Sequence, residues 1–271
     1  MMAYSGKTAP EFTAWLSLLS RLVRREVAGR YRGSLLGMSW SFLTPLFMLA
    51  VYTLVFSSVF KVKWGVAIEN AGTGTFALML FAGLIIHGLF AEVASAAPEI
   101  ILANPNYVKK VVFPLHILPM VTVGAALFHA LVSIGVLFAF ELLVLGRIPP
   151  TALLLPVVLA PFIPLLLGVG WLLASLGVFL RDIRQIVGPV ITAMLFLSPV
   201  FFPLQAAPEA LRPFLMLNPL TLIIVNVRKV LVYGQWPDFG QLALYGVVTG
   251  LFALAALWWF RKTQAGFADV L

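Results

Sequence analysis

The sequence predicts an all-α integral membrane protein with six transmembrane helices, an N-terminal amphipathic helix and re-entrant helices between spans five and six. Three observations support this fold class. Of the 271 residues, 62% are hydrophobic and only 10% are charged, whereas a soluble domain carries about 25% charged residues. Several apolar runs exceed the roughly 18 residues that mark a membrane span. The basic residues gather at the ends of these runs, which is typical of membrane topology.

Residues 11–30 are expected to form the amphipathic helix. At about 100° per residue, one face carries Phe12, Trp15, Leu16, Leu19, Leu22, Val23 and Val27. The opposite face carries Ser17, Arg21, Arg24, Arg25 and Ala28. An apolar stripe backed by arginines favours a helix in the membrane interface. The alternative is a helix packed on a soluble domain, but no part of this sequence resembles one. Residues 1–10 lack the apolar region of a cleavable signal peptide, so we expect the first span to act as its own insertion signal.

The whole chain, residues 1–271, is expected to form a single transmembrane domain. The six expected spans are residues 34–60, 76–93, 113–145, 152–180, 186–202 and 242–260. Pro45 lies inside the first span and is expected to kink it. Residues 96–112, which connect the second and third spans, mix apolar side chains with prolines and a lysine pair.

The distribution of lysine and arginine predicts that both ends of the chain are cytoplasmic. With the N-terminus inside, twelve of the 18 basic residues lie on the cytoplasmic side and six outside. The inside residues are Lys7, Arg21, Arg24, Arg25, Arg30, Arg32, Lys109, Lys110, Arg181, Arg184, Arg261 and Lys262. The outside residues are Lys61, Lys63, Arg147, Arg212, Arg228 and Lys229. This asymmetry follows the positive-inside rule and requires an even number of spans.

Residues 203–233 are too apolar for a solvated loop and are interrupted too often for a span. Prolines at 199, 203, 208, 213 and 219 divide this part of the chain into short pieces. Short helices at membrane depth are tolerated only where protein or a water-filled cavity surrounds them. We therefore favour a re-entrant pair of helices, and a folded external cap that rests on the membrane is the alternative.

The sequence lacks the motifs of several kinds of active site. It has no phosphate-binding GxxxxGK[ST] segment and no HExxH or GxSxG motif. With no cysteine, it has no thiol chemistry or Cys-ligated metal site. His87, His116 and His129 are far apart in sequence, so we interpret them as packing or interface residues rather than metal ligands. The net charge of +8 lies at span ends and does not indicate a nucleic-acid partner.

The carboxylates within the expected spans also narrow the possible functions. Glu92 lies near the cytoplasmic end of the second span and Glu141 near the outer end of the third, so neither is at a membrane midplane. Secondary carriers usually need ionisable groups inside their spans. A membrane-embedded glycan or lipid transferase would need a cluster of carboxylates or histidines at one membrane face. Both functions are therefore disfavoured, and the driving energy is expected to come from a partner protein.

Four segments together resemble one protein family. The first is the stretch RREVAGRYRGSLLGMSWSFLTPL at residues 24–46. The others are NPNYVKKVVFPLHILP at 104–119, VFLRDI at 178–183 continuing to SPV at 198–200, and FAD at 267–269. In this order they resemble permease subunits of polysaccharide and polyol-phosphate ABC exporters, the O-antigen and teichoic-acid type. The first stretch departs from the family pattern at Met38, usually aromatic, and at Thr44, usually asparagine, which could reflect a different polymer.

The resemblance implies a transport subunit without an ATPase site of its own. Its partners would be a second copy of the chain, two cytoplasmic ABC ATPase subunits that bind ATP and Mg, and membrane lipid. The implied cargo is a polysaccharide linked to undecaprenyl diphosphate, and the implied location is the bacterial inner membrane. An ABC permease that exports a drug or a small lipid is the main alternative. This chain itself is expected to bind no cofactor.

Two groups of site residues are expected near the cytoplasmic surface. The coupling segment, residues 96–112 with Phe113, would contact the ATPase through Asn104, Tyr107, Val108, Lys109, Lys110 and Phe113. An ordinary connecting loop is the alternative. The lipid diphosphate would be bound by Arg24, Arg25, Arg30 and Arg32. Arginine pairs bidentately with phosphate, although these residues could equally hold anionic phospholipid.

Two further groups are aromatic. The channel would be lined by Trp40, Tyr52, Phe56 and Phe60. Tyr52, Phe56 and Phe60 recur every four residues and so share one helix face, although lipid-facing or packing roles are the alternative for each residue. An outer gate would be formed by Phe201, Phe202, Phe214, Asn218 and Pro219.

Overall fold

The computed structural model describes residues 9–55, 73–109 and 113–270, and this part of the chain contains helices and no strand. The long helices are α1 (Ala9–Arg30), α2 (Trp40–Leu54), α3 (Thr73–Ala96), α5 (Ile117–Leu145), α7 (Phe162–Phe179), α8 (Ile183–Phe196) and α11 (Phe239–Thr263). Shorter α-helices are α4 (Pro105–Lys109), α6 (Leu155–Leu159), α9 (Arg212–Leu217), α10 (Pro219–Arg228) and α12 (Phe267–Val270). The all-α prediction is therefore confirmed for the described residues.

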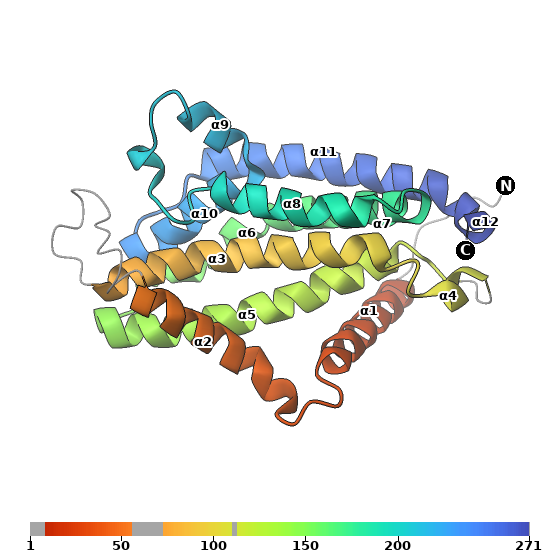
Figure 1. Ribbon diagram of the computed structural model, residues 1–271, viewed down its shortest axis with the longest axis horizontal. Helices are drawn as coiled ribbons and strands as arrows, with labels where there is room; N and C mark the ends of the chain where they lie inside the picture. The colour runs from red at the N-terminus through yellow and green to blue at the C-terminus, as the bar shows by residue number, and fades with distance from the viewer. Residues whose placement is uncertain (1–8, 56–72, 110–112, 271) are drawn as a thin grey trace.

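Helix α3 is the centre of the bundle. It contacts α2, α5, α7, α8 and α10, and most of its side chains are buried. Figure 1 shows α3 lying lengthwise between α5 on one side and α8 with α10 on the other. Its sequence is largely apolar on all sides, which is typical of a helix enclosed by other helices.

Helices α7 and α11 form a second close pair. A Cβ atom on Gly168 of α7 would lie 2.6 Å from the ring of Phe252 on α11. Because Gly168 has no side chain, the two helices can approach each other closely at this point. The predicted span 152–180 does not begin as one continuous helix: η5 (Pro150–Leu154), α6 and α7 follow one another. Pro156 and Pro161 have no amide hydrogen, so they favour helix starts at these points.

Within the described residues, five helical stretches are long and apolar enough to cross a membrane: Gly37–Leu54, Gly74–Glu99, Ile117–Leu145, Pro150–Phe179 and Phe239–Val270. They overlap five of the six predicted spans. The remaining prediction, residues 186–202, overlaps α8, which has 14 residues. At about 1.5 Å per residue, α8 alone is shorter than the roughly 30 Å hydrocarbon core. The multi-pass helical fold is confirmed, whereas the count of six spans is not.

Helix α1 is amphipathic as predicted, but part of its apolar stripe packs on protein. Leu22 lies in a cluster with Ile117 and Val121 at the beginning of α5. A Cβ atom on Gly124 would approach Val23 to 2.6 Å, so the small residue lets the two helices meet. The arginines of α1 are exposed, although Arg25 and Arg30 also contact other parts of the chain. The helix is thus attached to the bundle by the same face that was expected to contact the bilayer.

The proline-rich region after α8 forms η6 (Leu204–Ala206), α9, α10 and the π-helix η7 (Lys229–Tyr233). Helix α9 lies at the edge of the bundle in Figure 1. Helix α10 contacts α3 and α6, and most of its side chains are buried. Asn218 caps α10, because its side chain accepts a hydrogen bond from the amide of Leu220 at 2.9 Å.

Candidate functional site

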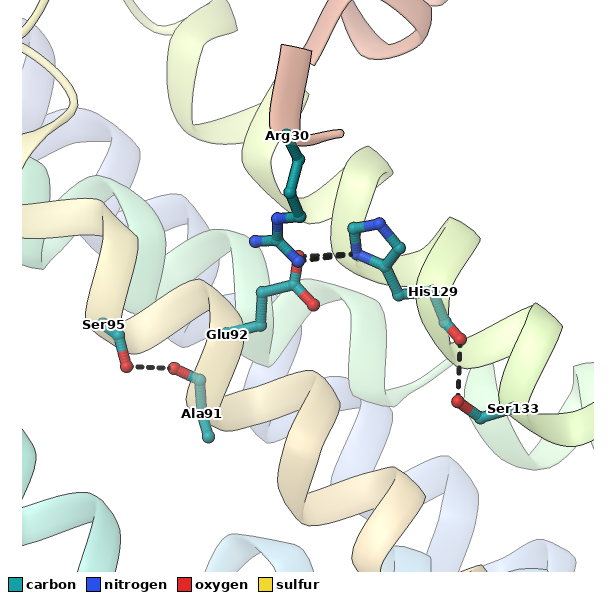
Figure 2. Close-up of polar contacts among 6 residues, drawn as sticks. All are labelled: Arg30, Ala91, Glu92, Ser95, His129 and Ser133. Atoms are coloured by element: carbon teal, nitrogen blue, oxygen red, sulfur yellow. Dashed lines mark hydrogen bonds and ion pairs between the residues drawn. The ribbon is translucent and has the colours of Figure 1, made fainter. Parts of the chain in front are cut away.

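A polar cluster joins the end of α1 to α3 and α5. One carboxylate oxygen of Glu92 on α3 lies 2.8 Å from the guanidinium of Arg30 and 2.8 Å from Nδ1 of His129 on α5. Figure 2 shows the three side chains converging from three helices. The same Nδ1 of His129 lies 3.0 Å from Arg30. The cluster therefore fixes the C-terminal end of α1 to two helices that pack against each other.

The electrostatics of this cluster are those of a partly solvated ion pair. The side chain of Arg30 is 50% exposed and that of Glu92 is 18% exposed. Because solvent screens a pair of this kind, it contributes at most about 1 kcal/mol to stability. Burial raises the pKa of the adjacent Tyr31 hydroxyl, and the charge of Arg30 offsets part of this increase. Figure 2 also shows that the hydroxyl groups of Ser95 and Ser133 bond to carbonyl groups of their own helices.

A cavity of about 370 Å³ adjoins the cluster between α2, α3 and α5. Glu92, His129 and Ser133 supply polar groups to its lining, whereas Met48 and Phe81 supply apolar ones. Tyr52, one of the predicted channel aromatics, also lines this cavity. Such an amphipathic lining suits a ligand that carries both polar groups and an apolar chain.

The coupling segment folds into the short helices η4 (Ala97–Glu99) and α4. Tyr107 stacks on Phe113, with ring centroids 4.5 Å apart. The guanidinium of Arg25 donates a hydrogen bond to the Tyr107 hydroxyl at 3.1 Å. The side-chain amide of Asn104 donates to the carbonyl of Ile100 at 2.8 Å, which holds the turn before α4. Val108 is half-buried, Lys109 is exposed, and Lys110 lies outside the described residues.

Arg228 on α10 is a site residue that sequence reasoning missed. Its side chain is 3% exposed and donates hydrogen bonds to the carbonyl groups of Met79 at 2.8 Å, Val200 at 2.7 Å and Pro199. It therefore ties α10 both to α3 and to the turn that follows α8. From the sequence alone, Arg228 was counted only among the basic residues expected on the outer side of the membrane. An arginine in a largely apolar stretch was the signal that could have found it.

The part of the chain that the structure describes contains no group of three or more His, Cys, Asp or Glu side chains placed to hold a metal ion. The carboxylate of Glu141 is buried near the C-terminal end of α5, and its oxygens have no hydrogen-bond partner among the described residues. The polar contacts described above join α1, α3, α5 and α10 to one another and to the coupling segment.

Most of this chain matches one known protein family. A family model described as "ABC-2 type transporter" matches residues 17–232, which include the end of α1, the coupling segment and α10. The chain belongs to the ABC-2 type transporter family. An O-antigen export system permease protein from Myxococcus xanthus is 28% identical over 262 residues, covering 96% of this chain and 97% of the relative. A protein of the same description from Klebsiella pneumoniae is 26% identical over 256 residues, covering 94% of this chain and 95% of the relative.

The arginines predicted to bind a lipid diphosphate have different surroundings in this ABC-2 transporter chain. Arg24 and Arg32 are exposed. Arg25 contacts the coupling segment, and Arg30 pairs with Glu92. The structure therefore separates this predicted group into residues with different neighbours.

The predicted channel and gate aromatics of the ABC-2 chain are only partly within the described residues. Trp40 is exposed at the start of α2, whereas Phe56 and Phe60 lie outside the described residues. Among the predicted gate residues, Phe201 stacks on Phe196 with centroids 5.7 Å apart, and Phe214 is 68% exposed. The partly buried gate residues are Phe201, Phe202 and Pro219. Asn218 is buried and donates hydrogen bonds to the carbonyl groups of Met194 and Leu197, both at 3.1 Å.

Proposed function

We propose that this chain is the membrane subunit of an ATP-driven exporter that moves a polysaccharide out of the bacterial cytoplasm. The carrying observation is the end-to-end similarity to proteins described as O-antigen export permeases, which covers at least 94% of this chain. Membership of the ABC-2 family and the five span-length apolar helices within the described residues support a transport role. The cargo is an O-antigen-like polysaccharide attached to undecaprenyl diphosphate.

The energy for export comes from two cytoplasmic ATPase subunits that bind ATP and Mg. The sequence of this chain has no phosphate-binding loop. Helices α4 and α12 lie at the same end of the molecule, with η4 against α7 and α8 (Figure 1). This end carries basic residues at Lys109, Arg181, Arg184, Arg261 and Lys262, which favours a cytoplasmic orientation in the inner membrane. The coupling segment at this end is the contact with the ATPase.

Two copies of the chain enclose the export path. The exposed apolar side chains of α2 and α8 supply faces for lipid or for the second copy. The cavity beside Arg30, Glu92 and His129 has the lining expected for the polar and apolar parts of the lipid carrier. Burial of α10 against α3 supports the re-entrant arrangement of residues 203–233 over an external cap.

Deletion of the gene from its native bacterium tests the cargo. We expect loss of surface polysaccharide and accumulation of the lipid-linked glycan inside the cell, because synthesis continues while export stops. A plasmid copy should restore the surface polymer. Normal surface polysaccharide in the deletion strain, with increased sensitivity to a drug instead, would contradict the proposal and favour a drug permease.

Replacement of Tyr107 by lysine tests the coupling segment. The substitution removes the ring that stacks on Phe113 and places an ammonium group next to the guanidinium of Arg25. We expect at least about a tenfold loss of export, equivalent to about 1.4 kcal/mol of coupling, with membrane insertion unchanged. The measurement is surface polysaccharide per inserted protein, and Phe113→Asp should behave in the same way.

Asn106→Lys is the matched control, because Asn106 is exposed on the same short helix. It adds the same charge without touching the aromatic pair. Export by Tyr107→Lys that equals export by Asn106→Lys would refute the coupling role.

A further inference from the structure

Phe267 belongs to a short chain segment that folds back onto the bundle, and its side chain is fully buried there. After α11, the chain turns through η8 (Gln264–Gly266) into α12, where Phe267 is 0% exposed. Its neighbours Ala268, Asp269 and Val270 are all exposed. One aromatic side chain therefore anchors this short helix, while the rest of it faces outward.

The Phe267 ring lies between three parts of the fold. Its centroid is 5.4 Å from that of Phe260 on α11 and 5.7 Å from that of Phe179 on α7. The same apolar cluster contains Ile101 and the partly buried Tyr107 of the coupling segment. Helix α12 also contacts α4 and α7 directly. Phe267 thus completes the apolar contact between the coupling segment, α7 and α11.

The backbones of the coupling segment and α7 also approach each other closely. A Cβ atom on Gly177 of α7 would overlap the carbonyl oxygen of Pro98 in η4. The indole of Trp171 on α7 donates to the carbonyl of His116, next to the coupling segment, at 2.9 Å. The hydroxyl groups of Ser175 on α7 and Thr263 on α11 are 2.7 Å apart. Because such close-packed contacts resist compression, these three elements are suited to move as one body.

We propose that Phe267 is a positioning residue that holds the coupling segment on α7 and α11, so that ATP-driven displacement of the segment carries both helices with it. This inference rests on the proposed function in one respect, namely that an ATPase pushes the segment. Removal of the ring leaves a gap between α12, α7 and α11. The segment then moves without the two helices, and ATP hydrolysis continues without proportionate export.

The test uses the full-length chain, purified with its co-purifying ATPase and reconstituted in lipid vesicles. For Phe267→Ala, we expect ATP hydrolysis within about twofold of the unaltered complex and export lowered at least about tenfold. Phe267→Leu, which refills most of the space, should recover most of the export. Val270→Ala is the matched control, because Val270 is exposed on the same helix and its truncation should change neither activity.

A distance measurement separates transmission from a merely structural role. Because the sequence has no cysteine, spin labels can be placed on single cysteines introduced at Asn106 in α4 and Arg261 in α11, both exposed. In the labelled protein that retains Phe267, ATP binding should leave the distance between the labels unchanged. In Phe267→Ala, it should change the distance or broaden its distribution.

Each outcome decides the inference. It is overturned if Phe267→Ala exports in proportion to its ATP hydrolysis, or if ATP changes the label distance when Phe267 is present. If Phe267→Ala fails to assemble, Phe267→Leu and the label pair with Phe267 present decide the question. A complex that hydrolyses ATP but moves no lipid-linked glycan refutes the proposed cargo, while the label distances still test the role of Phe267.

Discussion

Replacement of Arg228 by methionine is expected to lower the melting temperature of the purified chain by roughly 10 °C. The guanidinium donates to the carbonyl groups of Met79, Pro199 and Val200, all within the bundle. Methionine retains much of the length but none of the donors. Each buried carbonyl that loses its partner costs about 1–3 kcal/mol, and at this size about 1 kcal/mol lowers the melting temperature by about 2–4 °C. Thermal unfolding in detergent measures the effect.

Arg147→Met is the control for this prediction, because Arg147 is an exposed arginine in the turn after α5. Its replacement removes the same charge without removing a buried donor. Arg228→Lys should fall between the two, since an ammonium group has no planar set of donors to reach three carbonyl groups together. At this size, a stability difference of about 1 kcal/mol shifts the melting temperature by at least about 2 °C. If the melting temperatures of Arg228→Met and Arg147→Met differ by less than about 2 °C, α10 does not depend on these hydrogen bonds.

Arg228 also has a consequence for the proline-rich region. A Cβ atom on Gly83 of α3 would lie 2.9 Å from the guanidinium, so this glycine leaves the space that Arg228 occupies. The buried arginine therefore requires a matching site on α3, far away in sequence. We expect that α10 stays attached to α3 when the region after α8 moves, and that any motion of the gate residues occurs around this point.

Replacement of Gly177 by alanine is expected to separate the coupling segment from α7. The added Cβ atom would overlap the carbonyl oxygen of Pro98 and lie 2.7 Å from its Cα atom. Both are backbone atoms, so no side-chain rotation can relieve the overlap. Overpacking typically costs about 1–3 kcal/mol, and a displacement of η4 also disturbs the contact that transmits motion. We expect a lower melting temperature and at least about a tenfold loss of export.

Gly188→Ala in α8 is the matched control, and we expect it to leave the melting temperature unchanged or to raise it slightly. No atom lies within 4 Å of a Cβ built at Gly188, and alanine is favoured over glycine inside a helix by about 1 kcal/mol. This variant should be as stable as the unaltered chain or slightly more stable. Equal melting temperatures and equal export for the Gly177 and Gly188 variants would show that η4 can move away from α7 without consequence.

Gly177 and Phe267 lie at two separate points of the contact between the coupling segment and the bundle. Gly177 sets how closely η4 approaches α7, and Phe267 fills the space between α7, α11 and α12. Substitutions at Gly177 push these elements apart, whereas truncation of Phe267 leaves them loosely packed. Both should weaken the link between ATP hydrolysis and export, but only the first should introduce a steric overlap.

The sequence by itself determined the features that depend on local composition and periodicity. Long apolar runs specify helices of membrane length, as α3, α5 and α11 show. The spacing of Trp15, Leu19 and Leu22 specifies the buried face of α1. Absence of a phosphate-binding loop is also a property of the sequence alone. These features need no knowledge of which segments meet.

Only the tertiary structure decided which distant residues meet. Neither the pairing of Arg30 with Glu92 nor the carbonyl groups that Arg228 contacts can be read from spacing, because the partners come from separate helices. Phe267 lay in a recognised motif, yet its burial depends on α7 and α11. The 14-residue length of α8 also escaped prediction, because the apolar run continues past the end of the helix. Hydrophobicity fixes which segments leave water, whereas close packing and buried hydrogen bonds fix which of their side chains touch.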